Sequence, residues 1–261
     1  MIIQYPDFTT AEKVVHAFST REGGRSRPPF SALNMAFHVG DDPELVRANR
    51  KLFFANLGLD LAKSTWASQV HGDRVAVVTE ATAGAGALDP STALPGTDAM
   101  VSDTPGVSLC VMTADCLPIL IFDERLRAIG AVHAGWRGTL FKLPVKTLKV
   151  MSEVFGTDPA DCRVALGPGI GPCCFQVGQE VLERFAQEMP AEYSRFVVKK
   201  QTREYIDLYR ANSLNLQGIG VPAKNILVSS ACTSCNSDRF FSYRAEQGKT
   251  GRMVAVIGLL E

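Results

Sequence analysis

The chain has 261 residues, 46% hydrophobic and 21% charged, which is enough apolar material for one large domain or two small ones. Basic and acidic residues both number 27, so a net charge of zero argues against a nucleic-acid or membrane-surface partner. No apolar run is as long as a membrane span and the N-terminus lacks a signal-peptide pattern, so a cytoplasmic protein is expected. An odd count of 7 cysteines argues against a secreted disulfide framework.

Apolar spacing divides the chain into short strands and amphipathic helices. The first predicted elements are a strand at Val14–Ser19, a helix at Pro43–Leu57, and strands at Thr65–Val70 and Arg74–Thr79. Residues 80–97 are rich in Ala, Gly, Ser, Thr and Pro and are expected to form a mobile surface loop. Towards the C-terminus the predicted elements are a strand at Arg163–Leu166, helices at Gly178–Met189 and Asp207–Gly218, and strands at Ile226–Ser229 and Met253–Leu260.

The stretch from residue 107 to residue 140 carries the strongest signals for a site. It contains three apolar runs that predict strands, followed by a helical pattern: Val107–Met112, Pro118–Phe122, Ala128–His133 and the helix Gly138–Met151. The second and third strands run in opposite directions through a polar turn, so Cys116 and His133 are expected at one edge of the sheet. A thiol and an imidazole placed together suit either a nucleophile with its base or two ligands of one metal ion.

Other residues are candidates to join this site. His71 lies in a tight turn between two predicted strands and would stand at a strand end. Arg137 lies in the turn Gly135-Trp136-Arg137-Gly138 at the start of the predicted helix, where a guanidinium and free N–H groups favour an anion. Arg21, in a glycine-rich loop, could fold over the site and meet an anionic group. Asp98 either binds a ribose hydroxyl or caps a turn, and the cap is the preferred interpretation.

The remaining cysteines suggest a second, weaker possibility. Cys173 and Cys174 are adjacent, and Cys232 and Cys235 form a CxxC pair, so the four could make a structural zinc site. One CxxC without a second is weak evidence, and buried thiols are the expected role of these residues.

Five motifs together resemble the YfiH family: QVHG, TADCLPILIFD, AVHAGWRGT, GPGIGPCCFQVG and FFSYR…TGR. Members of that family have been described as laccase-domain proteins, polyphenol oxidases and purine nucleoside phosphorylases. The resemblance covers nearly the whole chain and implies a single catalytic domain over residues 1–261. It also implies an α/β (α+β) fold of layered sheets with outer helices, similar to the cysteine hydrolase domain of cytotoxic necrotizing factor.

The resemblance further implies three metal ligands, which are His71, Cys116 and His133. Two imidazoles and one thiolate suit Zn²⁺ and leave a fourth tetrahedral position for water or substrate. The implied reactions are cleavage of adenosine, inosine, guanosine and methylthioadenosine with phosphate, and deamination of adenosine. Purine nucleosides and phosphate are therefore the expected partners.

Phosphorolysis requires groups that hold phosphate and move protons. Arg137 is the first choice for phosphate, together with Arg21 or Arg244. Asp115, next to a ligand cysteine, is expected either to hydrogen-bond a ligand histidine or to act as an acid or base.

Two other functions use the same residues. The first is copper-dependent polyphenol oxidation, since two His and one Cys also form blue-copper centres, with Met100 or Met112 as a possible axial ligand. The chain has only 4 histidines, too few for the additional trinuclear cluster of a multicopper laccase. The second is a cysteine hydrolase with Cys116 as nucleophile and His133 as base.

Overall fold

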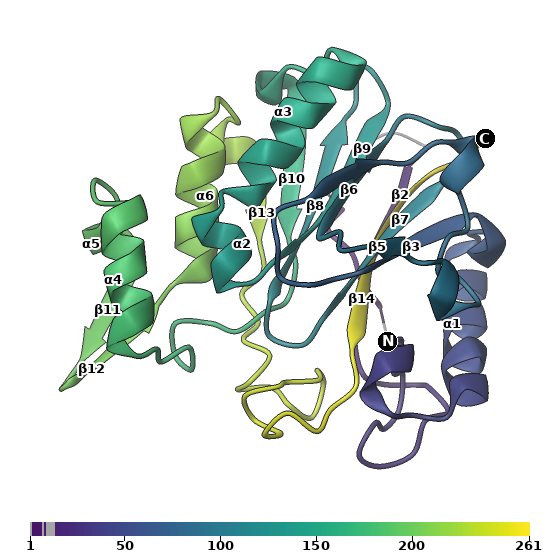
Figure 1. Cartoon of the computed structure of the whole chain (residues 1–261), viewed down its shortest axis with the longest axis horizontal. Helices are drawn as coiled ribbons and strands as arrows, with labels where there is room; N and C mark the ends of the chain where they lie inside the picture. Colours follow the sequence, from purple (N-terminus) through teal and green to yellow (C-terminus); the bar gives the residue numbers. More distant parts are fainter. Residues whose placement is uncertain (1, 7, 9–13) are drawn as a thin grey trace.

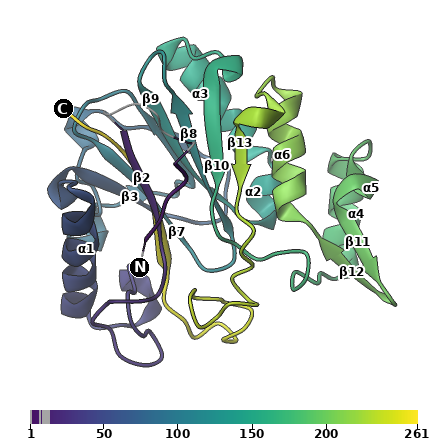
Figure 2. The ribbon, with the colours of Figure 1, turned by 180° about the vertical axis from the view of Figure 1, so that it is seen from behind.

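The computed structural model describes residues 2–6, 8 and 14–261, and these form two six-stranded β-sheets with helices outside them (Figures 1 and 2). The first sheet has the strand order β1 (Ile2–Ile3), β2 (Val14–Ser19), β14 (Met253–Leu259), β7 (Ser108–Thr113), β3 (Ser64–Ser68) and β5 (Leu94–Pro95). The second has the order β13 (Ile226–Val228), β10 (Cys162–Leu166), β8 (Leu117–Asp123), β9 (Ala128–Ala134), β6 (Ala99–Ser102) and β4 (Val75–Val77).

The two sheets pack face to face because their central strands are apolar on both sides. Successive side chains of a strand point to opposite faces. In β7, Leu109 and Val111 join the apolar layer between the sheets, whereas Cys110 and Met112 belong to the core on the outer side of the first sheet. This pattern explains why the central strands read as continuous apolar runs in the sequence.

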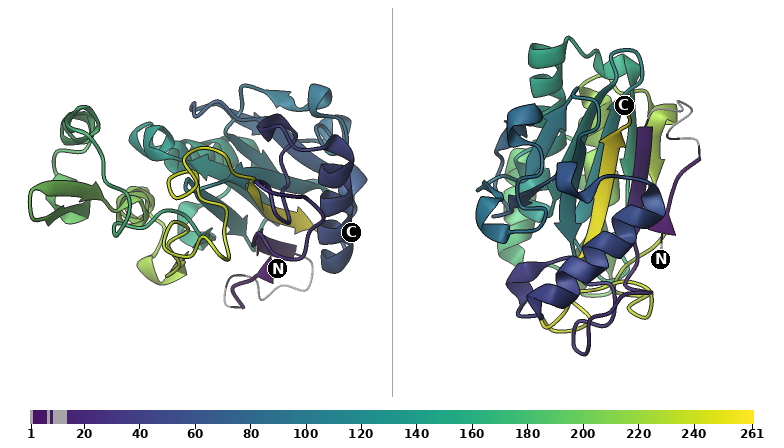
Figure 3. Two further views of the ribbon diagram at one scale, coloured as in Figure 1. Left: turned by 90° about the horizontal axis from the view of Figure 1, so that it is seen from below. Right: turned by 90° about the vertical axis from the view of Figure 1, so that its right-hand side faces the viewer.

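Helices complete the layers. α1 (Pro43–Leu57) covers the first sheet, packing Phe53 and Phe54 against it. The outer face of the second sheet is covered by α2 (Trp136–Leu140), α3 (Leu143–Phe155) and α6 (Leu208–Gly218). A smaller group projects from one end of the molecule (Figure 3, left) and consists of α4 (Gln179–Glu188), α5 (Tyr193–Phe196) and the hairpin β11 (Val197–Lys200) and β12 (Arg203–Ile206).

The expected α/β fold of layered sheets and outer helices is confirmed, as is the helix Pro43–Leu57, which starts at the Asp42 cap and ends at Gly58. The predicted helix Gly138–Met151 is instead two helices, since Lys142 adopts φ +54° between α2 and α3. None of the described helices has the length and apolar character needed to cross a membrane.

Residues 80–97 lie on the surface as expected, but they are held in place and do not form a loop that could close over the site. Short 3-10 turns and β5 order this segment, and the buried Arg50 of α1 donates hydrogen bonds to the carbonyls of Gly86 and Ala87 at 2.7 and 2.8 Å. The segment therefore packs on the side of the first sheet covered by α1, and none of its residues lines the pocket that contains His71, Cys116 and His133.

Candidate metal centre

The β8–β9 hairpin brings Cys116 and His133 together, as the sequence predicts. Pro118 pairs with His133 and Leu117 with Ala134, so Cys116, one residue before β8, lies at the same end of the hairpin. The preceding strand, β7, does not pair with this hairpin, because β7 belongs to the first sheet and the hairpin to the second. Cys116 thus lies in the connection that crosses from one sheet to the other.

His71 completes the group from the segment between β3 and β4. Its ring centroid lies 4.8 Å from that of His133, with the planes at 74°. The ligand atoms of His71, Cys116 and His133 all lie within 4.8 Å of one another. The structure therefore gathers the three residues that the family resemblance implies as metal ligands.

Asp98 holds both histidines in place. Its carboxylate accepts hydrogen bonds from the backbone N–H groups of Val70, His71 and Gly72, at 3.1, 3.0 and 2.8 Å. His133 Nδ1 lies 2.8 Å from the same carboxylate. Since Nδ1–H points at Asp98, His133 Nε2 is the nitrogen available to a metal ion, an arrangement common among metal-bound histidines.

This geometry corrects the expected substrate role of Asp98. The side chain is buried and is not among the residues that line the pocket, so it does not face a ribose. The preferred interpretation, a turn cap, is confirmed for the turn that carries His71. Burial raises the pKa of Asp98, but hydrogen bonds from His133 and Gly72 more than offset it, so the pKa falls below its ordinary value.

The thiol of Cys116 and the imidazole of His133 favour each other's charged forms. Burial raises the pKa of Cys116, but His133 and then His71 lower it by a larger amount. Burial lowers the pKa of His133, but Cys116 and Asp98 raise it above its ordinary value. These opposite shifts favour a thiolate–imidazolium pair in the metal-free protein, and a bound cation would displace the imidazolium proton.

Gly135 leaves room for the cysteine sulfur. A Cβ at this position would lie 2.8 Å from Cys116 Sγ and 3.5 Å from His71 Cδ2. The Gly135 backbone has φ −72°, which any residue can adopt, so the requirement for glycine here is one of space and not of conformation.

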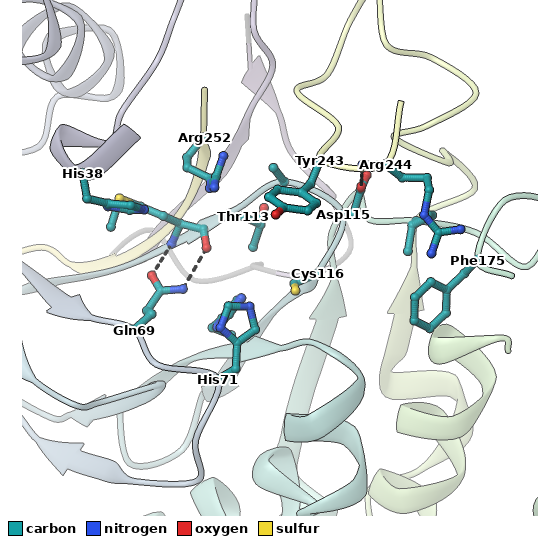
Figure 4. A pocket seen from close by; sticks show the side chains of 14 residues that line it. His38, Gln69, His71, Thr113, Asp115, Cys116, Phe175, Tyr243, Arg244 and Arg252 are labelled. Carbon is teal, nitrogen blue, oxygen red and sulfur yellow. Dashed lines mark hydrogen bonds between the residues drawn. The ribbon is translucent and has the colours of Figure 1, made fainter. Parts of the chain in front are cut away.

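The three residues lie in a pocket with a volume of about 380 Å³, within the roughly 300–1,000 Å³ typical of small-molecule sites. In Figure 4, His71 and Cys116 point toward the middle of the pocket, and Arg252 and Tyr243 lie across it from His71. The other lining residues are His38, Gln69, Met112, Thr113, Ala114, Asp115, His133, Ile170, Phe175 and Arg244.

Asp115 faces the pocket in a strained conformation, with φ +87°. One carboxylate oxygen accepts a hydrogen bond from Thr233 Oγ1 at 2.6 Å, and the other accepts one from the Arg244 backbone N–H at 2.7 Å. The expectation that Asp115 bonds a ligand histidine is wrong, because Asp98 bonds His133. A role for Asp115 as an acid or base stays a prediction.

Two of the predicted phosphate residues lie outside the pocket. Arg137 is exposed, with its guanidinium carbon 4.4 Å from the centroid of the Trp136 ring. Arg21 donates hydrogen bonds to the carbonyls of Ser31 and Ser237 and to the carboxylate of Glu246. Neither side chain is placed to hold phosphate at this centre.

The pocket instead contains two other arginines, one of which sequence reasoning did not single out. Arg244 lines the pocket and donates to the carbonyls of Cys174 and Gln176, each at 3.0 Å. Arg252, the unpredicted one, donates to the carbonyls of Thr250 and Gly251. Burial lowers the pKa of Arg252, while the nearby Cys116 raises it.

Arg252 and Tyr243 belong to the FFSYR…TGR motif, which was a signal in the sequence that could have identified them. Gln69 likewise belongs to the QVHG motif, whereas His38 carried no such signal. The Gln69 amide both donates to and accepts from the Met112 backbone at 2.8 Å (dashed in Figure 4), which fixes the strand end beside the pocket.

The chain is similar to proteins with curated names and to solved structures. Over 248 residues it is 39% identical to "Purine nucleoside phosphorylase YlmD" of Geobacillus stearothermophilus, covering 95% of this chain and 90% of the relative. Over 255 residues it is 37% identical to "Purine nucleoside phosphorylase YfiH" of Escherichia coli, covering 98% of each.

Two crystal structures share the fold over nearly the full length. YlmD from Geobacillus stearothermophilus superposes with a TM-score of 0.93 at 38% identity, covering 98% of this chain and 94% of that one. The Bacillus licheniformis protein YfiH superposes with a TM-score of 0.92 at 35% identity, covering 98% and 100%. A family model described as "Multi-copper polyphenol oxidoreductase laccase" matches residues 15–260. The chain therefore belongs to this laccase-like family, which includes the YfiH and YlmD proteins.

Proposed function

We propose that the protein is a purine nucleoside phosphorylase whose metal ion is Zn²⁺, held by His71, Cys116 and His133. The curated relatives carry that activity in their names. The observation that supports it most strongly is the grouping of two imidazoles and one thiolate, with Asp98 behind one imidazole, in a pocket that also contains two arginines.

The donor set fits zinc. Zn–N bonds of 2.0–2.1 Å and Zn–S bonds of about 2.3 Å put tetrahedral ligand atoms roughly 3.3–3.6 Å apart. The observed ligand atoms, all within 4.8 Å of one another, need only small shifts to reach this spacing. Three protein ligands also leave a position open, as in catalytic zinc sites.

Copper fits less well, because Met112, although it lines the pocket, has its sulfur in contact with Arg50, and Met100 lies outside the pocket. The Met112 sulfur lies 3.9 Å from Arg50 Nη2, and Met100 is buried in the layer between the two sheets. A blue-copper centre has a weak axial ligand in addition to its three strong ones. These placements favour zinc over the copper-dependent oxidation suggested by the family description.

In phosphorolysis, a phosphate oxygen attacks C1′ of the ribose, and the C–N bond breaks with its electron pair leaving on the base, which then takes up a proton. We assign phosphate to Arg252 and Arg244, which replace Arg137 and Arg21 in this role. Planar guanidinium groups bind phosphate through charge-assisted hydrogen bonds. A Zn²⁺ ion held here would add Lewis-acid charge that stabilises negative charge developing in the pocket.

Other side chains of the pocket suit the nucleoside. Phe175 and Tyr243 offer aromatic surfaces for a purine ring. The Asp115 carboxylate already accepts one hydrogen bond on each oxygen and keeps lone pairs for another. We assign Asp115 to hydrogen-bond the departing base and to carry its proton, which retains the acid or base role expected from the sequence.

Deamination of adenosine is a second reaction that such a centre can support, since a zinc site can activate water for attack on a purine carbon. It differs from phosphorolysis in needing no phosphate and in yielding inosine. A cysteine hydrolase differs again, because it would act through Cys116 in metal-free protein and form a covalent intermediate.

The test is a product analysis on zinc-loaded protein incubated with adenosine, with and without phosphate. The proposal expects adenine and ribose 1-phosphate only when phosphate is present, and expects Cys116→Ala to abolish both. Cys162→Ala is a matched control, because Cys162 is a buried thiol in β10, outside the pocket. Unchanged adenosine with zinc-loaded protein would reject the proposal, and phosphate-independent inosine would identify a deaminase instead.

A further inference from the structure

Four cysteines that do not line the pocket form a separate cluster of thiols. Cys173 and Cys174 lie in the segment after β10, and Cys232 and Cys235 lie in the segment after β13. Their four sulfur atoms all lie within 4.8 Å of one another. Cys235 Sγ lies 3.4 Å from Cys173 Sγ and 3.3 Å from Cys174 Sγ. The fold therefore brings together two pairs of cysteines that are far apart along the chain.

Burial in a core does not explain this cluster. Cys173 and Cys235 are exposed and Cys174 is partly exposed, so the expectation of buried thiols is met only by Cys232. A cysteine that serves as a small apolar residue is usually buried. Gathering exposed thiols at one point on the surface needs another reason.

The sulfur spacing matches a tetrahedral metal site. Four sulfurs bound to Zn²⁺ at about 2.3 Å lie roughly 3.8 Å from one another. A disulfide would join one pair at about 2.05 Å and leave the other sulfurs more distant. Here one sulfur has two neighbours at nearly the same distance, and the four form a compact tetrad.

The backbone around the sulfurs is already arranged. Gly171 N–H donates to Cys232 Sγ at 3.2 Å. A Cβ at Gly171 would lie 3.3 Å from Cys173 Sγ and 3.1 Å from the Cys232 Cβ, so glycine leaves the room that the sulfurs need. The two segments also pair directly, with Thr233 N–H donating to the Gly169 carbonyl at 2.9 Å.

From this geometry we propose that Cys173, Cys174, Cys232 and Cys235 bind one Zn²⁺ ion as four thiolates. On binding, the four thiols release their protons to solvent and four Zn–S bonds form, with no change of oxidation state. Four thiolates close the coordination sphere, so this site is structural and cannot bind substrate at the metal. Lys200 Nζ, 3.2 Å from the Pro172 carbonyl, places a positive charge near the anionic cluster.

The site would brace one wall of the pocket. The segment that carries Cys173 and Cys174 also supplies Ile170 and Phe175 to the lining. The segment that carries Cys232 and Cys235 includes Thr233, whose hydroxyl bonds Asp115. Zinc would join these two segments through residues that do not themselves line the pocket. This inference does not depend on the reaction proposed above, because it concerns metal content and thiol chemistry alone.

The first experiment measures zinc per chain by elemental analysis, on protein purified under reducing conditions without chelator. We expect two zinc ions in the wild type and one in Cys116→Ala, because that variant keeps the four-cysteine site. Cys235→Ser, altered at an exposed position, should also lose one zinc ion, and Cys162→Ala should lose none. A Cys116→Ala protein without zinc would overturn the proposal.

The second experiment uses only wild-type protein, so it does not depend on the folding of a variant. Zinc-bound protein is treated with iodoacetamide and the modified cysteines are located by mass spectrometry, before and after removal of zinc with a chelator. We expect the exposed Cys173 and Cys235 to be protected before chelation and modified after it. Equal modification before and after, or an intact mass lower by two hydrogens per disulfide, would overturn the proposal.

Discussion

The substitution Asp98→Asn tests the carboxylate that positions His71 and His133. One oxygen of Asp98 accepts the His71 N–H and His133 Nδ1–H, and the other accepts the N–H groups of Val70 and Gly72. An asparagine has the same shape but turns an NH₂ group toward one of these two pairs. Two hydrogen bonds are therefore lost, and the two N–H groups that made them face the asparagine NH₂ group, which cannot accept a hydrogen bond.

The magnitude follows from the charge of the acceptor. Hydrogen bonds to charged groups contribute about 1.5–3 kcal/mol each, so losing two lowers the free energy of unfolding by at least about 3 kcal/mol. For a domain of this size that is a fall in Tm of roughly 6–12 °C. The weakened support for His71 and His133 should also raise the zinc Kd about 10- to 100-fold.

The assays are thermal unfolding of metal-free protein and competition for zinc with a chelator of known affinity. Asp123→Asn is the matched control, because Asp123 is equally buried and its Oδ1 accepts the N–H groups of Arg125 and Leu126, which an asparagine carbonyl can keep. We expect its zinc Kd to match the wild type. If Asp98→Asn binds zinc within about twofold of the wild type, the proposed role of Asp98 is refuted.

Three further changes test the site. In Gly135→Ala the new Cβ would lie 2.8 Å from Cys116 Sγ, so the zinc Kd should rise on the order of tenfold or more. The control Gly178→Ala, where a Cβ meets only open space, should leave the zinc Kd unchanged. Arg252→Ala should raise the phosphate KM by on the order of tenfold or more while Arg137→Ala leaves it unaltered; equal effects would contradict the assignment. In metal-free protein the lowered pKa of Cys116 keeps the thiolate present below the ordinary thiol pKa of about 8.5. The rate of Cys116 alkylation should therefore stay high at about pH 8 and fall only as the pH approaches the lowered pKa of about 6. A pH–rate midpoint at or above about 8.5 would show that the imidazoles do not stabilise the thiolate.

Local signals in the sequence predicted the elements that depend on local chemistry. The helix Pro43–Leu57 has an Asp42 cap, a proline in its first turn and Gly58 at its end, and each of these acts over a few residues. The closeness of Cys116 and His133 was predictable for the same reason, because a hairpin register depends on the length of the polar turn that joins its strands.

Features that depend on distant parts of the chain were not predictable in this way. β7 and β8 are consecutive and apolar, and nothing local shows that β7 pairs with β14 and β3 in a different sheet. Asp98 accepts three N–H groups because tertiary packing brings the turn at residues 70–72 beside it.

The arginines show the same limit for the site. Arg137 adjoins the HAGW motif in sequence, yet the start of α2 directs it to the surface beside Trp136. Arg252 is far from that motif in sequence, and β14 brings it to the pocket. Sequence proximity therefore favoured an arginine that lies outside the pocket, since the direction of a side chain at a helix start is not set by the neighbouring motif.

The most direct test of the account is zinc titration of metal-free protein while ribose 1-phosphate release from adenosine and phosphate is measured. Activity should be absent without zinc, should rise in proportion to zinc bound at His71, Cys116 and His133, and should not return in Cys116→Ala at any zinc concentration. Phosphorolysis by metal-free protein, or by zinc-treated Cys116→Ala at the wild-type rate, would contradict the claim that this centre carries the reaction.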